Sequence, residues 1–109
     1  MFVPNYRAVT SLNSITHGDT AALANWEAMF AGDTAEYYVR TTRTVQANDT
    51  WGQAEELGDW EGERMQRGDR VRVSGTYAAK WVQRDDRWML QAEVFTLLSC
   101  EGSETACTP

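Results

Sequence analysis

The last third of the chain alternates apolar and polar residues over two long runs that flank a short polar turn. The runs cover residues 70–82 and 88–98, and the turn covers residues 83–87. Alternation with a period of two is typical of strands that have one buried and one solvent-exposed face. The pattern predicts a hairpin whose buried face carries Val71, Val73, Gly75, Tyr77, Ala79 and Trp81 on one strand and Trp88, Leu90, Ala92, Val94, Thr96 and Leu98 on the other.

Shorter alternating segments upstream predict more strands, and one stretch has helical spacing. Residues 35–46 and 51–63 are expected to be strands, joined to their neighbours by polar turns at 47–50 and 67–69, and residues 6–14 form a weaker strand candidate. Asp19 and Thr20 precede an expected helix over 21–31, since both residue types cap free backbone amides. Apolar residues spaced three and four apart predict a stripe on this helix that faces the core: Ala22, Leu23, Trp26, Met29 and Phe30.

This order of elements predicts an α+β domain, in which a curved, cone-like antiparallel sheet of four to five strands packs on one main helix. We assign residues 1–99 to a single domain and residues 100–109, which are rich in Gly, Ser and Thr, to a flexible tail. A chain of 109 residues is long enough for one hydrophobic core. Five Trp, four Tyr and three Phe supply large side chains for that core.

Short turns fix the register of neighbouring strands, so cross-strand partners can be proposed. The turn at 67–69 places Glu56 opposite Tyr77 and Gly58 opposite Gly75. Two glycines that face each other would leave a hollow in the apolar face of the sheet, because neither has a side chain to fill it. The other turns give further expected pairs: Trp81 with Trp88, Tyr37 with Trp60, and Thr41 with Glu56.

Polar residues within this predicted apolar face suit acid–base chemistry. Glu56 is the candidate general acid or base, because burial in an apolar pocket raises the pKa of a carboxyl group. Tyr77 is the candidate hydroxyl donor that would stabilise an oxyanion. These two are the predicted catalytic residues, and the predicted ligand-binding residues around them are Tyr37, Thr41, Arg43, Trp60 and Trp81.

Glu56 also has a second interpretation, as one half of an internal ion pair with Arg43. Tyr77 would then be only an aromatic residue of the core. An arginine within about 4–6 Å would lower the pKa of the carboxyl group and argue against proton transfer. Such a pair would favour the anchoring of an anionic ligand.

The charge of the chain excludes some partners. Sixteen acidic and ten basic residues give a net charge of −6, and seven of the acids lie between residues 48 and 69. Such a surface repels phosphate, so neither nucleic acid nor an anionic membrane is expected as a partner. The sequence contains no stretch typical of a membrane span and does not start like a signal peptide, which predicts a cytoplasmic location.

The cysteines and the histidine give no metal site. Cys100 and Cys107 both lie in the expected tail, and we interpret them as free thiols in a reducing compartment, with a disulfide as the alternative. His17 is the single histidine, and the sequence has no CxxC motif. We therefore predict neither a metal ion nor a cofactor.

Three segments carry a resemblance to a known family: A-E-E-L-G-D-W at 54–60, V-S-G-T-Y-A-A-K-W at 73–81, and R-W-M-L-Q-A-E-V-F-T at 87–96. They resemble the nuclear transport factor 2-like (NTF2-like) superfamily, in particular its SnoaL-like polyketide cyclase and ketosteroid isomerase-like domains. The family's Gly-x-Tyr-x-x-x-Trp strand and its following Trp-containing strand correspond to Gly75, Tyr77, Trp81 and Trp88. The resemblance extends over about residues 15–98 and implies a cavity between sheet and helices.

The resemblance implies that a small hydrophobic molecule binds in that cavity, in a proton-transfer enzyme of isomerase, cyclase or dehydratase type. Because the superfamily also includes non-catalytic domains, it leaves open whether this chain is an enzyme. Members usually carry two helices before the first strand, and this sequence starts near that strand, so we expect a more open cavity. The alternative is an assembly module that forms a homodimer through an outer sheet face carrying Tyr38, Leu57, Met89, Phe95 and Leu97.

Overall fold

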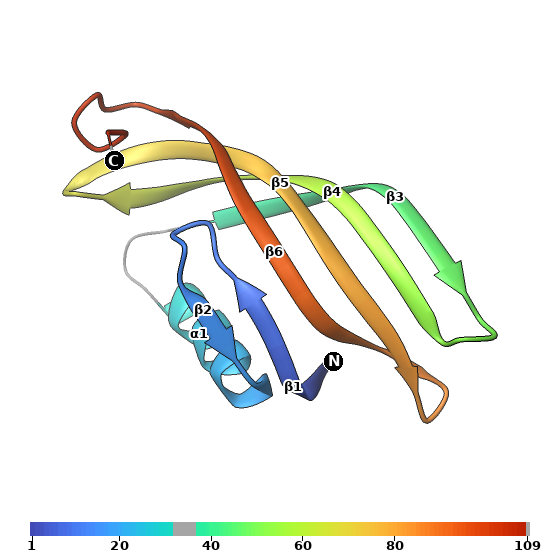
Figure 1. Cartoon of the computed structure of the whole chain (residues 1–109). Helices are drawn as coiled ribbons and strands as arrows, with labels where there is room; N and C mark the ends of the chain where they lie inside the picture. The colour runs from blue at the N-terminus through green and yellow to red at the C-terminus, as the bar shows by residue number, and fades with distance from the viewer. Residues whose placement is uncertain (32–36, 109) are drawn as a thin grey trace.

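A computed structural model describes residues 1–31 and 37–108, and it shows one long, curved sheet with a single helix at one side (Figure 1). The side chains of residues 26 and 28–31 are also outside the described part, so the predicted helix stripe of Trp26, Met29 and Phe30 lies outside the described residues. In chain order the elements are β1 (Phe2–Val9), β2 (Ile15–His17), α1 (Asp19–Ala31), β3 (Tyr37–Asn48), β4 (Gln53–Gln66), β5 (Asp69–Arg84) and β6 (Arg87–Glu101).

The six strands are arranged in the order β2-β1-β6-β5-β4-β3. Strands β3 to β6 form the expected antiparallel meander, whereas β1 lies parallel to β6 and β2 pairs antiparallel with β1. The α+β class with a curved sheet is therefore confirmed. The sheet is mixed because β1 lies parallel to β6, and it has six strands rather than four to five because Ile15–His17 forms an additional short strand, β2.

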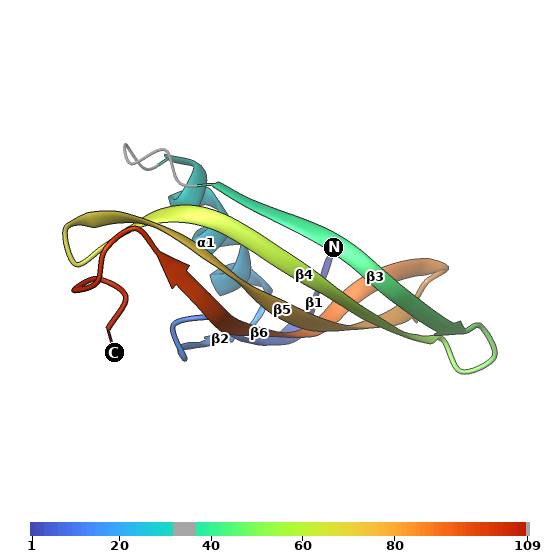
Figure 2. The same cartoon turned by 90° about the horizontal axis from the view of Figure 1, so that it is seen from above.

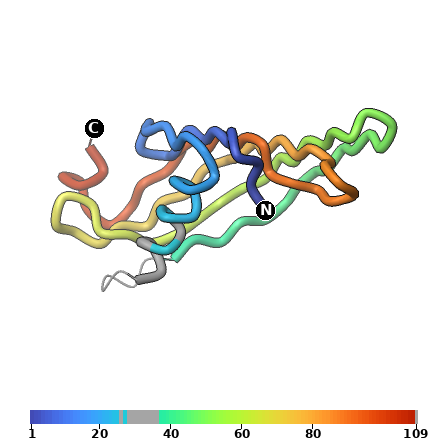
Figure 3. The backbone as a smooth tube through the Cα atoms, turned by 90° about the horizontal axis from the view of Figure 1, so that it is seen from below, coloured from blue at the N-terminus to red at the C-terminus, as the bar shows by residue number. Residues whose placement is uncertain are grey.

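The helix begins two residues earlier than expected, directly after Gly18. Gly18 has a positive φ of 86° and donates its amide to Tyr6 O at 2.7 Å, which turns the chain from β2 into α1. Helix α1 lies against β1 and β2, and within the described part of the chain it contacts none of β3 to β6. Ala22 is buried as predicted, but Leu23 is exposed because it lies off the covered side. Figures 2 and 3 show that the far ends of the four long strands extend well beyond the helix.

The β4–β5 hairpin differs from the expected register by two residues. Its turn is centred one residue later than the expected pairs imply, with Gln66 paired to Asp69, so Gly58 lies opposite Tyr77 and Trp60 lies opposite Gly75. A shift of two residues keeps every side chain on its expected face, because side chains along a strand alternate with a period of two. We call the face that carries Glu56, Trp60, Val73, Tyr77 and Ala79 the inner face.

An extra residue in β6 reverses which of its side chains face inward. Trp81 pairs with Leu90 but Lys80 pairs with Ala92, so Gln91 forms a β-bulge. Beyond this bulge Glu93 lies opposite Ala79 on the inner face and is buried. The expected inward positions beyond the bulge are therefore wrong. Val94 is on the outer face and exposed. Leu98, also exposed, lies at a further register shift of β6, since Gly75 pairs with Leu97 but Ser74 pairs with Ser99.

A second bulge, at Arg43, has the same effect on β3. Thr42 pairs with Gly58, but Thr44 pairs with Leu57, which leaves Arg43 as the extra residue. The turn before β4 also lies two residues later than predicted, since β3 ends at Asn48 and β4 begins at Gln53. On the side of the bulge toward the start of β3, the inner face carries Tyr38, Arg40 and Thr42 instead of Tyr37, Val39 and Thr41.

The expected hollow between facing glycines is absent from the described sheet, because aromatic rings lie over them. A Cβ atom on Gly58 would lie 2.6 Å from the Tyr77 ring. A Cβ atom on Gly75 would lie 3.1 Å from Nε1 of Trp60, which donates to the carbonyl oxygens of Thr76 and Thr96. The rings of Tyr77 and Trp60 therefore occupy the space that side chains on these glycines would need, and at Gly75 the carbonyl oxygen of Thr96 also leaves no room for a Cβ atom.

The C-terminal residues fold back on the sheet, which corrects two expectations. Cys100 and Cys107 form a disulfide, with Cα atoms 5.5 Å apart, so the interpretation as free thiols is wrong. Ala106 is fully buried in the core and accepts a hydrogen bond from Gln66 Nε2 at 2.5 Å. Strand β6 also continues to Glu101, past the predicted domain boundary at residue 99, and the tail is anchored rather than free. Among the described residues no helix has the length and apolarity to cross a membrane.

Candidate functional site

Glu56 is the centre of a polar cluster on the inner face. Its Oε2 accepts hydrogen bonds from the Tyr77 hydroxyl at 2.5 Å and from Thr42 Oγ1 at 2.9 Å. Its Oε1 accepts one from Trp81 Nε1 at 3.0 Å. Two strands thus supply donors to one carboxylate on the strand between them: Thr42 comes from β3, Tyr77 and Trp81 come from β5, and Glu56 itself is in β4.

The cluster continues behind Tyr77 through a buried ion pair. The guanidinium carbon of Arg40 lies 4.2 Å from the centre of the Tyr77 ring, and Arg40 Nη1 lies 2.7 Å from Oε2 of Glu93. Oε1 of Glu93 accepts a hydrogen bond from the Tyr6 hydroxyl at 2.7 Å. The polar side chains therefore form a chain across the inner face, from Glu56 near one end to Tyr6 on β1.

These contacts determine the charge of the cluster. Burial raises the pKa of Glu56, but the hydrogen bonds from Tyr77, Thr42 and Trp81 and the charge of Arg40 outweigh it, so the pKa lies below its ordinary value. Burial lowers the pKa of Arg40, but the carboxylate of Glu93, the side chain of Tyr77 and the carboxylate of Glu56 together outweigh it, and the net pKa is raised. Glu56 and Arg40 are thus both charged at neutral pH.

Tyr6 is held in its neutral form. Burial raises the pKa of its phenol, and the hydrogen bond to Glu93 together with the charge of that carboxylate raises it further. The hydroxyl is therefore available as a donor to Glu93 at every pH where the protein is expected to work. Its role in this arrangement is to satisfy the buried carboxylate.

An open, mainly apolar groove lies beside Glu56 on the inner face. It has a volume of 410 Å³, within the range of small-molecule sites. It is formed at the ends of β3 to β6 that extend beyond α1 (Figures 2 and 3), so the sheet builds it without the helix. Its lining residues are Thr42, Val45, Ala47, Asp49, Ala54, Glu56, Trp81 and Trp88.

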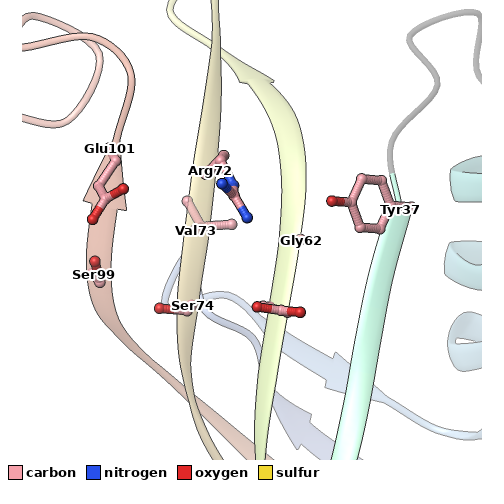
Figure 4. A pocket seen from close by; sticks show the side chains of 8 residues that line it. Tyr37, Gly62, Arg72, Val73, Ser74, Ser99 and Glu101 are labelled. Atoms are coloured by element: carbon pink, nitrogen blue, oxygen red, sulfur yellow. The ribbon is translucent and has the colours of Figure 1, made fainter.

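A smaller depression on the outer face of the sheet is less suited to a ligand. It has a volume of 160 Å³ and a mainly polar lining from four neighbouring strands, including Tyr37, Arg72, Ser74, Ser99 and Glu101 (Figure 4). That volume is below the usual range for a site that encloses a small molecule. The groove beside Glu56 is therefore the candidate site.

The structure brings together only some of the predicted site residues. Glu56, Tyr77 and Trp81 are in direct contact, as the alternation of β4 and β5 indicated. Trp60 is on the same face, but its side chain is buried. Its indole N–H donates to the backbone carbonyl oxygens of Thr76 and Thr96. Catalytic or binding roles for these four residues stay predictions.

The other three predicted ligand-binding residues are on the wrong face. Tyr37 and Thr41 pair with Glu63 and Asp59 on the outer face because of the bulge in β3. Arg43 is the bulged residue, and its Nε lies 3.1 Å from Asp59 rather than beside Glu56. The proposed Glu56–Arg43 ion pair is therefore wrong, and Arg40 is the cation near Glu56 instead.

Four residues of the cluster were not predicted: Tyr6, Arg40, Thr42 and Glu93. Arg40 and Thr42 alternate with Tyr37, Thr41 and Arg43 along β3, and the bulge at Arg43 is what places them on the inner face. Glu93 was assigned to the outer face for the same reason on β6. The described residues contain no group of three or more His, Cys, Asp or Glu side chains that could hold a metal ion.

Comparison of the sequence with known families and curated proteins finds no match, but the fold has clear relatives among solved structures. The Kfla4162 protein from Kribbella flavida is 17% identical, with a TM-score of 0.73, over 98% of this chain and 78% of that one. A hexachlorocyclohexane dehydrochlorinase (LinA) type 2 is 12% identical, with a TM-score of 0.70, over 99% and 75%. An NTF2-like protein with a cystatin-like fold from Novosphingobium aromaticivorans is 15% identical, with a TM-score of 0.69, over 96% and 68%. The resemblance to NTF2-like proteins is thus confirmed as a likeness of fold.

Proposed function

We propose that this protein binds a small hydrophobic molecule with one polar end in the groove beside Glu56. The observation that carries the proposal is the position of a charged carboxylate at the wall of an apolar groove that two tryptophans help to form. The apolar lining provides most of the binding energy, and Glu56 orients the polar end. NTF2-like neighbours include a protein named as a dehydrochlorinase, so the fold is compatible with small-molecule chemistry.

We rank binding ahead of a proton-transfer reaction of isomerase, cyclase or dehydratase type. A general base works best when its pKa is near the pH of the reaction. The pKa of Glu56 is lowered by three hydrogen bonds and by Arg40, which makes it a weaker base than an ordinary glutamate. The arrangement favours a carboxylate that stays charged and accepts hydrogen bonds over one that takes up a proton.

A fragment screen followed by NMR tests the proposal. Neutral and charged aromatic compounds would be added to the protein labelled with ¹⁵N, and the indole N–H signals of its five tryptophans would be recorded. Binding in the groove predicts that the signals of Trp81 and Trp88 shift together and saturate, while that of Trp51, exposed in the β3–β4 turn, does not. If no fragment moves the Trp81 and Trp88 signals, the proposed function is wrong.

A second candidate function is a homodimer formed through the outer face of the sheet. Three of the five residues predicted for this interface, Tyr38, Phe95 and Leu97, pack against the core on the inner side and cannot contribute to it. Val39, Val94 and Leu98 instead leave about half or more of their surface exposed, and Val94 pairs with Ala78 beside Leu57. Sedimentation equilibrium tests this: Val94→Lys should dissociate a dimer, and a wild-type protein that stays monomeric at high concentration contradicts it.

A further inference from the structure

We infer that the groove selects organic cations, such as amphiphilic amines, over neutral and anionic molecules of the same shape. This inference rests on the proposed function, since it names the class of ligand for the same groove. It is carried by three independent features of the groove: its charge, its aromatic walls and the unused acceptor capacity of Glu56.

The charge of the groove is negative. Two of its eight lining residues, Asp49 and Glu56, carry carboxylates, and none of the eight is a lysine or an arginine. Arg40 lies behind the Tyr77 ring, where its guanidinium is engaged by Glu93. The cluster of Glu56, Glu93 and Arg40 therefore has one more negative than positive charge, and a cation in the groove would balance it.

The walls of the groove suit a cation as well as an apolar body. Trp81 and Trp88 line it together, and tryptophan is the side chain whose ring face attracts cations most strongly. The indole N–H of Trp81 is fixed by its hydrogen bond to Glu56, so the orientation of the ring is set before a ligand arrives. Val45 and Ala54 provide apolar surface for the rest of the molecule.

Glu56 has room for one more donor. A carboxylate offers about four lone-pair positions in total. Oε2 uses two positions, for Tyr77 and Thr42, and Oε1 uses one, for Trp81. An ammonium group of a ligand could donate to the remaining position on Oε1, and such a charge-assisted bond is about twice as strong as a neutral one. A ligand carboxylate has no proton to donate and would be repelled.

Three probes with the same carbon skeleton test this selectivity: phenylbutylamine, phenylbutanol and phenylbutyrate. At neutral pH their polar ends are cationic, neutral and anionic respectively. Isothermal titration calorimetry at low salt should show that the amine binds about tenfold or more tightly than the alcohol, and the alcohol more tightly than the carboxylate. The preference should weaken as salt is added, because ions screen the charge of the groove.

Two variants test whether the preference for the amine over the alcohol depends on Glu56. Glu56→Gln should remove most of the amine's roughly tenfold advantage over the alcohol and leave the alcohol's affinity nearly unchanged, while Asp49, Trp81 and Trp88 keep a small preference for the cation. Glu55→Gln removes the same charge from the next residue on β4, whose side chain is exposed on the opposite face, and should leave the preference intact. Circular dichroism would verify that both variants are folded.

The outcomes separate this inference from the proposed function. If the alcohol binds in the groove as tightly as the amine, or if phenylbutyrate binds best, the inference about cations is wrong while the ligand site stands. If none of the three probes binds and no fragment moves the Trp81 and Trp88 signals, both the proposed function and the inference about cations are wrong. An amine preference that is as large in Glu56→Gln as in the wild type also overturns the inference, because it would arise elsewhere.

Discussion

Tyr77 donates a hydrogen bond to Glu56 although the two residues are not cross-strand partners. Tyr77 lies opposite Gly58, and Glu56 lies opposite Ala79. The missing side chain at Gly58 lets the Tyr77 ring lie across the strand, so that its hydroxyl reaches Oε2 of Glu56 at 2.5 Å. A glycine thus allows the diagonal contact that lowers the pKa of the carboxyl group in the candidate site.

Tyr77→Phe should raise the pKa of Glu56 toward its ordinary value. The phenol stabilises the charged carboxylate, and phenylalanine keeps the ring but removes the donor. An NMR titration of the Glu56 side-chain carboxyl carbon measures this pKa directly. Tyr37→Phe, on the outer face, is the matched control and should change nothing.

The same variant should alter the acid side of the stability curve. Because the folded-state pKa of Glu56 is lowered, its contribution to stability is present above the unfolded-state pKa and is lost as the pH falls through the folded-state value. In Tyr77→Phe this loss should be smaller. An equal pKa for Glu56 in the wild type and in Tyr77→Phe would contradict the assigned hydrogen bond.

Breaking the ion pair between Arg40 and Glu93 should destabilise the protein strongly. The side chain of Glu93 is 3% exposed and that of Arg40 is 28% exposed, so removal of one partner leaves the other charge largely buried. Glu93→Leu should cost about 3 kcal/mol in the free energy of unfolding, measured in urea. The double variant with Arg40→Met should cost less than the sum of the two single variants.

Arg43→Met is the control for that experiment. Its ion pair with Asp59 leaves about half of each side chain exposed, so its loss should cost less than about 1 kcal/mol. Equal costs for Arg43→Met and Glu93→Leu would mean that burial does not distinguish the two pairs, contrary to the structure.

Tyr6 should make the protein sensitive to alkaline pH. Its folded-state pKa is raised above the unfolded value, so the unfolded chain loses a proton near pH 10 while the folded chain keeps it. Stability is therefore full below about pH 10 and falls as the pH rises further. Tyr6→Phe should flatten this fall, at a cost of about 1–3 kcal/mol at neutral pH because Glu93 loses a donor. Chemical denaturation at several alkaline pH values measures both effects.

Reduction of the disulfide should loosen the C-terminal residues. The bond between Cys100 and Cys107 closes a short loop, for which loop-closure entropy gives about 2–3 kcal/mol. Cys107→Ser, or wild type in reductant, should melt at a lower temperature, and hydrogen exchange should speed up at Ala106 before the sheet is affected. Unchanged melting in reductant would contradict a structural role.

Because such bonds persist in oxidising compartments, the disulfide counts against the predicted cytoplasmic location, which stays a prediction.

The hairpins and the central contact of the site could be predicted from the alternation of residues alone. Alternation assigned Glu56, Tyr77 and Trp81 to one face, and the two-residue error in the β4–β5 register did not matter because it preserves the face. The predicted contact between Tyr77 and Glu56 is present, although the two residues are diagonal neighbours and not directly opposite each other.

The positions of the other residues in the Glu56 cluster depend on two bulged residues that the alternation of apolar and polar residues does not reveal. A bulge reverses the faces of the positions on one side of it relative to those on the other side. The bulges at Arg43 on β3 and Gln91 on β6 therefore place Arg40 and Glu93 on the inner face. The alternation on both sides of each bulge looks regular in the sequence. The disulfide likewise could not be derived, since two nearby cysteines are compatible with both oxidation states.

The most direct measurement of the central claim is a crystal structure of the protein soaked with phenylbutylamine. We expect density for the ring between Trp81 and Trp88, with the ammonium nitrogen at hydrogen-bond distance from Oε1 of Glu56. Density only elsewhere, such as in the outer depression beside Arg72, would contradict it, as would an empty groove at ligand concentrations that saturate the protein in solution.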